Sequence, residues 1–226
     1  MMAAVATAYT PLPLSFTRLS EEDALERSRA FLVGIAARRS VRHFSSEPVP
    51  RELIENAIRA AGSSPSGANQ QPWTFVAVFD PKVKARIRGA AEREEALLYT
   101  ERATVEYLDA LEPIGTDSSK PHLTDAPCVI AVFEQPWSFD ADGEKSKNYY
   151  VRESVGIAVG ILLVALHTSG LATLSHAPSP MGFLKEILGR PENERPFLLI
   201  PVGYPTPDAE VPALEKKTLE EIADFV

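Results

Sequence analysis

One short segment gathers positive charge in a chain that is otherwise acidic. Arg38, Arg39, Arg42 and His43 stand close together there, although the 226 residues carry a formal net charge of -8. Guanidinium groups bind phosphate well because their planar fork of N–H donors matches its oxygens, and Ser40 adds a hydroxyl. The alternative is structural, since cations at the C-terminal end of a helix complement the helix dipole. The spacing alone allows both interpretations, a phosphate site or an ordinary helix end.

A second set of residues could bind both charges of an amino acid. Glu95 and Tyr99 are four residues apart in a predicted helix, so their side chains share one face. Lys120 lies in the loop-like stretch that follows. A carboxylate, a phenol and an ammonium group could together hold the ammonium and carboxylate of a bound amino acid. The alternative is a solvated helix face on which the tyrosine has no role.

Three further segments carry weaker signals. Residues 63–73 are rich in Ser, Pro and Gly, which is typical of a loop. They form either an ordinary surface loop or a ligand cradle in which Gly67 lets backbone amides approach a flat ring closely. The Pro-rich residues 175–180 predict a turn first and a site second. Cys128 opens an apolar strand, where a cysteine is usually inert packing.

Several familiar kinds of site are missing from the sequence. It contains no P-loop, no G-x-G-x-x-G after a strand and no G-x-S-x-G. The four histidines, at positions 43, 122, 167 and 176, lack metal-ligand spacing, so no metal site is expected. The negative net charge argues against binding to nucleic acid or to anionic membranes.

The size and composition are those of a soluble globular protein. The residues are 45% hydrophobic and 24% charged, and a chain of this length can bury a core without disulfides or metals. One cysteine is consistent with a reducing compartment, the N-terminus lacks a signal-peptide pattern, and the apolar run 155–166 is short for a membrane span. We expect a cytoplasmic protein, with an extended arm over residues 1–19 and a single domain over residues 20–226.

The hydrophobic pattern predicts alternating helices and strands. The predicted helices cover residues 20–38, 51–62, 82–111, 149–168, 182–189 and 219–226, and the predicted strands cover residues 74–79, 128–134, 171–175 and 197–205. Ser20 and Asp23 suggest a capping box at the first helix, whereas residues 112–125 and 135–148 look irregular. The helix over 149–168 has no polar face, so we expect a sheet on one side of it and another helix or subunit on the other, in a three-layer α/β arrangement.

Taken together, several segments resemble the FMN-dependent nitroreductase superfamily, and more closely its iodotyrosine deiodinase branch. These segments are RRSVRHF, PSGANQQPWTFV, EREEALLY, YYVRESVGIAVGILLVALHTSGL and LLIPVGYP, and the match runs in order from about Glu21 to the C-terminus. The resemblance implies an α+β fold built as a three-layer sandwich, and a domain-swapped homodimer with two FMN sites at the subunit interface. The membrane anchor of the animal members is not seen, so no membrane partner is expected.

The resemblance also implies roles for individual residues. Those implied to bind FMN are Arg38, Arg39, Ser40 and Arg42 at the phosphate and ribityl end, Lys216 on the same phosphate, Pro65, Ser66 and Gly67 along the isoalloxazine ring, and Ser175, His176 and Ala177 near the flavin N5. Those implied to bind substrate are Glu95, Tyr99 and Lys120 on the zwitterion of a halotyrosine, and Ala68, whose backbone amide meets the phenolate.

One position departs from the pattern of the branch. A run of threonines places a hydroxyl near flavin N5 in the deiodinases, whereas this chain has Ser175, His176 and Ala177 there. Ala177 has no hydroxyl, although its backbone N–H could still reach N5. Loss of this donor is expected to disfavour one-electron steps and to favour hydride-type steps. This departure therefore argues against dehalogenation and for nitro reduction.

The function that the resemblance implies is an FMN-dependent oxidoreductase that dehalogenates halotyrosines, with NADH or NADPH as electron donor. The alternative is an NAD(P)H-dependent nitroreductase that acts on nitroaromatics. A flavin-binding sensory protein without turnover is a more distant alternative. The partners expected in either enzyme are a small aromatic substrate and a second copy of the chain.

Overall fold

The computed structural model describes residues 9–140 and 142–226, which fall into two compact units that divide after Ala37. All the candidate site residues lie in the second unit, so the site can be described within that unit alone. The predicted organisation, an arm over 1–19 and one domain over 20–226, stays a prediction.

The first unit consists of a stretch without regular secondary structure and one helix. Residues 9–20 are extended or irregular, and helix α1 spans Glu21–Ala36. Its start is as predicted, because the hydroxyl of Ser20 accepts a hydrogen bond from the Asp23 N–H at 3.1 Å. Residues 1–8 of the predicted arm lie outside the described residues.

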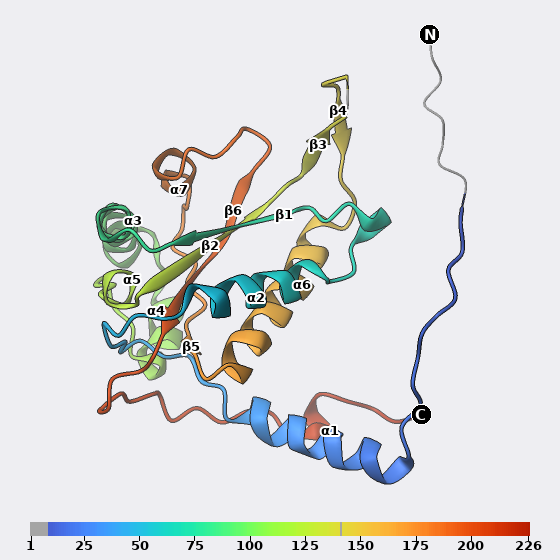
Figure 1. Ribbon diagram of the computed structural model, residues 1–226. Coiled ribbons are helices and arrows are strands. Elements are labelled where there is room, and N and C mark those ends of the chain that lie inside the picture. Colours follow the sequence, from blue (N-terminus) through green and yellow to red (C-terminus); the bar gives the residue numbers. More distant parts are fainter. Residues whose placement is uncertain (1–8, 141) are drawn as a thin grey trace. The chain divides into compact units, whose positions relative to one another are not determined.

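A four-stranded antiparallel sheet in the order β1–β2–β6–β5 forms the centre of the second unit (Figure 1). The strands are β1 (Trp73–Val78), β2 (Cys128–Glu134), β5 (Ala172–Thr173) and β6 (Arg195–Gly203). All four were predicted, and β2 has the predicted bounds. Cys128 is fully buried in β2, and burial raises the pKa of its thiol to about 12, which fits the prediction that it is inert packing.

Helices cover both faces of this sheet and produce three layers. They are α2 (Arg51–Gly62) and α6 (Val151–Thr168) on one face, and α3 (Pro81–Leu97), α5 (His122–Asp125) and α7 (Phe183–Ile187) on the other. Ile130 of β2 packs with α2 and α6, and the next residue, Ala131, packs with α3 and α7, because successive strand side chains point to opposite faces. The predicted three-layer α+β fold is confirmed.

The prediction of a single helix over residues 82–111 is wrong. Helix α3 ends at Leu97, a π-helical turn follows at Leu98–Arg102, and helix α4 begins anew at Val105 and ends at Leu111. Thr104 causes the restart, since its hydroxyl accepts a hydrogen bond from the Tyr107 N–H at 3.3 Å and caps α4. The break places Tyr99 on the π-helical turn, an element that is frequent at functional sites.

Three other expectations were wrong. Residues 112–125, expected to be irregular, contain the 3₁₀ turn Glu112–Ile114 and the short helix α5. Residues 135–148, expected to be irregular, contain the antiparallel hairpin of β3 (Trp137–Phe139) and β4 (Lys145–Lys147). The ammonium of Lys145 lies 5.2 Å from the Trp137 ring centroid, a cation–π contact that composition does not reveal. The predicted tail helix over 219–226 is a single 3₁₀ turn, Leu219–Glu221.

Candidate functional site

The arginine segment and the C-terminal tail line one pocket of about 250 Å³. The Val41 N–H donates to Thr173 O at 3.0 Å, so the segment lies beside β5. The lining residues are Arg38, Arg39, Ser40, Arg42, Ile114, Leu174, Ser175, Pro212, Leu214 and Lys216. The structure therefore brings together all the residues expected at the FMN phosphate and ribityl end, and adds Ser175 to them.

This pocket is strongly cationic. Three guanidinium groups and the ammonium of Lys216 line it, and among the described residues around it none is acidic. Arg39 Nη2 also donates to Pro212 O, which ties the tail to the arginines. Because guanidinium and ammonium groups pair with phosphate oxygens, the pocket suits the phosphate of FMN. The structural alternative, cations at a helix end, does not require such a pocket.

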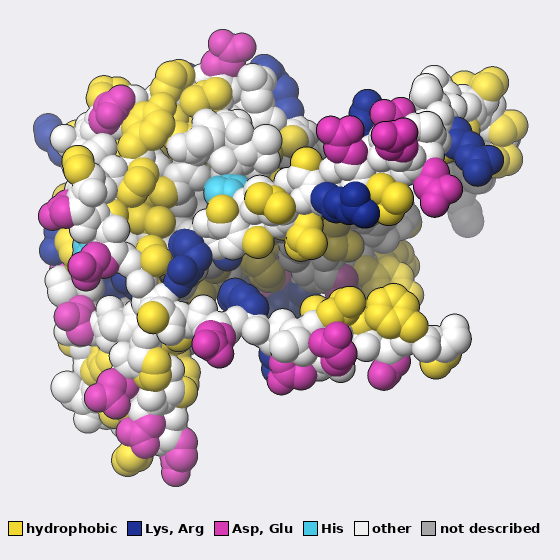
Figure 2. Space-filling view, turned by 90° about the horizontal axis from the view of Figure 1, so that it is seen from below, with side chains coloured by type: hydrophobic (Ala, Val, Ile, Leu, Met, Phe, Trp, Pro, Cys, Tyr) yellow, Lys and Arg dark blue, Asp and Glu magenta, His cyan; other side chains and the backbone are white. Residues whose placement is uncertain are grey.

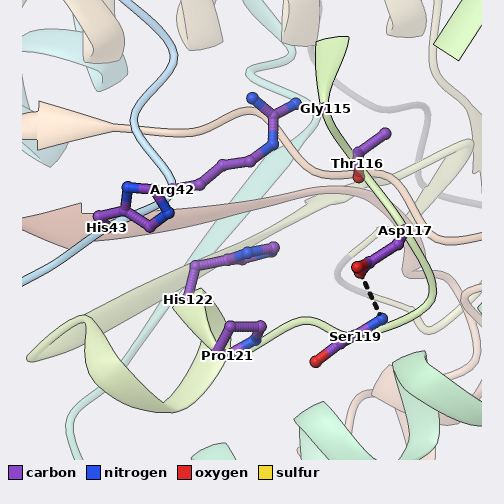
Figure 3. A pocket seen from close by; sticks show the side chains of 8 residues that line it. All are labelled: Arg42, His43, Gly115, Thr116, Asp117, Ser119, Pro121 and His122. Carbon is purple, nitrogen blue, oxygen red and sulfur yellow. Dashed lines mark hydrogen bonds between the residues drawn. The ribbon is translucent and has the colours of Figure 1, made fainter. Parts of the chain in front are cut away.

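Arg42 also reaches a second pocket, of about 180 Å³ (Figure 3). It is lined by Arg42, His43, Gly115, Thr116, Asp117, Ser119, Pro121 and His122. In Figure 3 the guanidinium of Arg42 extends toward the side of Gly115 and Thr116. Burial lowers the pKa of Arg42, and the nearby Tyr99 partly opposes that shift. Arg42 thus joins the cationic pocket to the loop that follows α4.

Glu95, Tyr99 and Lys120 come together beside this second pocket. Lys120 Nζ lies 3.1 Å from Glu95 Oε2, with side-chain exposures of only 2% and 8%. The same Nζ lies 5.8 Å from the centroid of the Tyr99 ring. Burial raises the pKa of Tyr99, so its phenol stays protonated at neutral pH and donates to Thr116 O at 3.0 Å. The three groups predicted to hold a zwitterion are thus neighbours in the fold.

The polar groups of this cluster are already occupied by the chain itself. An ammonium has three N–H donors, and Lys120 Nζ faces three acceptors, which are Glu95 Oε2, Thr116 Oγ1 at 3.1 Å and Asp117 O. Tyr99 donates to the backbone of the same loop. A substrate carboxylate can therefore reach Lys120 and Tyr99 only if the backbone at Thr116 and Asp117 moves away.

The loop predicted to line the flavin ring has a tightly constrained backbone. A Cβ at Gly67 would lie 2.6 Å from Tyr149 O, so only glycine fits there. Ala68 has φ 49° and ψ 26°, in the left-handed region. Ala68 and Pro65 are exposed, and none of the residues that the structure describes accepts a hydrogen bond from the Ala68 N–H. This amide is available to a ligand, as its predicted role requires.

The ring-lining loop and strand β5, beside which the arginine segment lies, are at opposite ends of helix α6 (Figure 1). The Gly67 N–H donates to Ser154 Oγ in the first turn of α6, whereas Val41 pairs with Thr173, shortly after the last turn. Eighteen residues separate the ends of this helix, which corresponds to about 27 Å. Within one chain, therefore, the structure does not bring Pro65, Ser66, Gly67 and Ala68 to the pocket.

The segment Ser175–Ala177 has alternating side-chain directions. Ser175 and Ala177 are exposed and Ser175 lines the cationic pocket, whereas His176 is buried and is not among the lining residues. The His176 N–H donates to Leu199 O at 2.9 Å and its carbonyl accepts from the Leu199 N–H at 2.8 Å. The side chain of His176 thus points away from the pocket. The Ala177 N–H meets no acceptor in the described part of the chain, and its reach to flavin N5 stays a prediction.

His176 packs instead against His122, a residue that the sequence did not mark as functional. The two ring centroids are 5.1 Å apart in an edge-on arrangement. Within the described residues neither Nε2 atom has a hydrogen-bond partner. Burial, with the charges of Lys120 and Arg42 adding to it, lowers the pKa of His122 to about 4 and that of His176 to about 3. Both imidazoles are therefore neutral at physiological pH.

This pair makes a prediction for the pH dependence of stability. Unfolding exposes both imidazoles and returns their pKa to about 6.5, so the unfolded state binds more protons and the free energy of unfolding falls as the pH falls. Stability from the pair is complete above pH 6.5 and is lost as the pH drops toward 4. Between pH 6.5 and 5 we expect a loss of roughly 1.5 kcal/mol per histidine, measured by urea unfolding at one protein concentration. The variant His176→Leu should show about half the loss, and an unchanged slope would contradict the assignment.

A family model described as the nitroreductase family matches residues 35–204. Among curated relatives, the iodotyrosine deiodinase of Haliscomenobacter hydrossis is 51% identical over 206 residues, which cover 91% of this chain and 93% of the relative. Iodotyrosine deiodinase 1 of Mus musculus is 45% identical over 93% of this chain and 74% of its own length.

Solved structures show the same likeness. The crystal structure of oxidised iodotyrosine deiodinase bound to FMN and 3-iodo-L-tyrosine matches 86% of this chain and all of its own, with a TM-score of 0.73 and 30% identity. A nitroreductase with bound FMN from Bacteroides fragilis matches 87% of this chain with a TM-score of 0.62 and 20% identity, which supports the fold alone.

Proposed function

The chain belongs to the nitroreductase family, and from that premise we propose that it is an FMN-dependent oxidoreductase that reductively dehalogenates halotyrosines. The observation that carries the proposal is the cluster of Glu95, Tyr99 and Lys120 beside Arg42. This cluster places groups suited to the charges of an amino acid next to a pocket suited to the phosphate of FMN. The relatives named iodotyrosine deiodinase, at 42–51% identity, support it.

The FMN phosphate is proposed to lie among the guanidinium groups of Arg38, Arg39 and Arg42. Lys216 and the hydroxyl of Ser40 line the same pocket and would add further donors. Bound FMN would supply the electrons of the reaction, and the protein would supply binding and orientation. NADH or NADPH as the source of those electrons is part of the proposal.

The overall reaction adds two electrons and one proton to a 3-halotyrosine, breaks the carbon–halogen bond, forms a carbon–hydrogen bond and releases halide. Glu95 would pair with the substrate ammonium, while Lys120 and Tyr99 would bind its carboxylate. The free N–H of Ala68 would donate to the phenolate oxygen, where a fixed backbone donor stabilises negative charge. Release of Thr116 and Asp117 from Lys120 would accompany substrate entry.

The proposal includes a domain-swapped homodimer, because within one chain the two halves of the FMN site lie at opposite ends of α6, a helix about 27 Å long. The ring-lining loop of one copy would meet the cationic pocket of the other. Gly156, Ile157 and Gly160 leave one face of α6 exposed and apolar. Figure 2 shows that hydrophobic side chains gather at several places on the surface. Among the described residues, α6 is also the one helix long and apolar enough to cross a membrane, a test that core helices of soluble proteins pass too. We propose that a second copy covers it, in the cytoplasm.

Replacing Ile157 by aspartate is expected to weaken the dimer and to release FMN together with it. Ile157 is 47% exposed on α6 in the single chain, and an interface would bury the new carboxylate without a partner. A penalty of about 2 kcal/mol corresponds to roughly thirtyfold weaker association. Analytical ultracentrifugation and FMN content per chain would measure both effects. Val105→Asp, at an apolar position 70% exposed on α4, is the control and should remain dimeric.

A single-turnover experiment tests the proposed function. The reduced, FMN-loaded protein is mixed without oxygen with 3-iodotyrosine, and separately with a nitroaromatic compound. The proposal expects flavin reoxidation with release of one iodide and one tyrosine per flavin. Reoxidation by the nitroaromatic alone, with no halotyrosine binding, would replace the proposal with the nitroreductase alternative. One observation favours the nitroreductase alternative: position 177 is alanine, which offers no hydroxyl.

A further inference from the structure

Two side chains fasten the loop that carries Ala68 to the start of α6. Ser154 is 1% exposed, and its hydroxyl accepts from the Gly67 N–H at 3.3 Å and donates to Tyr150 O at 2.6 Å. The amide of Gln70 makes a second connection, because its Oε1 accepts from the Tyr149 N–H at 2.7 Å and its Nε2 donates to Lys147 O at 3.3 Å. The loop is thus held at two points to one segment of backbone.

A backbone hydrogen bond within this loop fixes the direction of one peptide group. The N–H of Ala68 belongs to the same planar peptide as the carbonyl of Gly67, and in a trans peptide the two point in opposite directions. The Gln70 N–H donates to that carbonyl at 3.0 Å. The carbonyl therefore points into the loop, and the Ala68 N–H must point out of it.

The loop would not hold this geometry by local preference. Ala68 and Asn69 have φ of 49° and 54°, respectively, and each left-handed residue other than glycine costs about 1 kcal/mol. Such conformations persist only where surrounding contacts impose them. Among the described residues, the side-chain contacts from outside the loop to its backbone come from Ser154, while Gln70 reaches outward from within it.

We infer that Gln70 and Ser154 are positioning residues that aim the Ala68 N–H at the phenolate oxygen of the substrate. This inference rests on the proposed function. Neither side chain needs to touch the substrate. A donor held in place before binding favours the ionised phenol over the neutral one, so these residues set how acidic the bound phenol becomes and how strongly the phenolate is preferred.

The test measures the ionisation of bound 3-iodotyrosine in the FMN-loaded, oxidised protein. Dissociation constants are determined by flavin fluorescence across a pH series, and the absorbance of the phenolate is followed in the complex. In Gln70→Ala and in Ser154→Ala the apparent pKa of the bound phenol should rise toward that of the free amino acid. The preference for phenolate over phenol should fall roughly tenfold, the effect of losing one well-placed hydrogen bond. FMN content should not change.

Two variants sharpen the comparison. Gln71→Ala is the matched control, because the Gln71 side chain makes only 3.5 Å contacts with Asn69, and it should behave like the wild type. Gln70→Glu keeps an oxygen for the Tyr149 N–H and should retain most of the effect. If the wild type binds and ionises 3-iodotyrosine but both alanine variants do so equally well, the positioning role is overturned while the proposed function stands. If the wild type itself does not bind 3-iodotyrosine, both are overturned.

Discussion

Replacing Arg38 and Arg39 together by alanine is expected to give a colourless protein that no longer retains FMN. Both side chains line the cationic pocket, and the double change removes two of its three guanidinium groups. A hydrogen bond to a charged group contributes about 1.5–3 kcal/mol, so losing two such pairings should weaken FMN binding at least about a hundredfold. FMN content per chain after gel filtration, followed by titration of the apoprotein with FMN, measures the effect.

The matched control is a second pair of arginines. Arg51 and Arg59 lie on α2 with side-chain exposures of 80% and 72%, and their joint replacement by alanine should leave the protein yellow. Because Arg39 also donates to Pro212 O, circular dichroism should verify that the test variant is folded. A folded double variant with one FMN per chain would show that the phosphate binds elsewhere.

The arginine segment could be found from the sequence because its members are adjacent in the chain. Charge density is a local property, and Arg38 to Arg42 need no folding to be recognised as a group. The rest of the pocket is different. Ser175 and Lys216 join the arginines only because β5 pairs with Val41 and the tail returns to Arg39. No spacing rule links such distant positions, and only the resemblance suggested them.

The helices and strands also differ in how well the sequence predicted them. Strand β2 was predicted to its ends because six apolar residues in succession, at positions 128–133, favour a central strand. In the structure all six are buried. The break between α3 and α4 was missed because residues 98–104 have no proline or glycine. It depends on one capping hydroxyl, that of Thr104, which outweighs helix propensity at that point.

Part of the site could not be predicted because it is made by pairing across the fold. Sequence periodicity placed Glu95 and Tyr99 on one face of a helix. It did not reveal that Lys120 forms an ion pair with Glu95 and donates a hydrogen bond to Thr116. The attachment of Gln70 to Tyr149 is of the same kind. In both cases a polar side chain meets backbone or charge from another element, and hydrophobic patterning carries no information about such contacts.

Replacing Glu95 by glutamine is expected to weaken halotyrosine binding at least tenfold, or about 1.4 kcal/mol. Glutamine keeps the shape and a hydrogen-bond acceptor, but it removes the negative charge proposed to meet the substrate ammonium. It also leaves the ammonium of Lys120, which is 2% exposed, without its ion-pair partner. Removing one member of a buried pair costs about 3–5 kcal/mol of stability. Equilibrium titration with 3-iodotyrosine and urea unfolding measure the two effects separately.

A control and a compensating change separate binding from stability. Glu94→Gln alters the neighbouring carboxylate, which pairs instead with Arg102 at 3.0 Å, and it should leave affinity for 3-iodotyrosine unchanged. Adding Lys120→Met to Glu95→Gln removes both buried charges, so much of the lost stability should return. Affinity for the zwitterion should fall further, because the proposed partner of the substrate carboxylate is then missing as well. If affinity recovered together with stability, the ion pair would only hold the fold together, and Glu95 and Lys120 would have no part in binding the substrate.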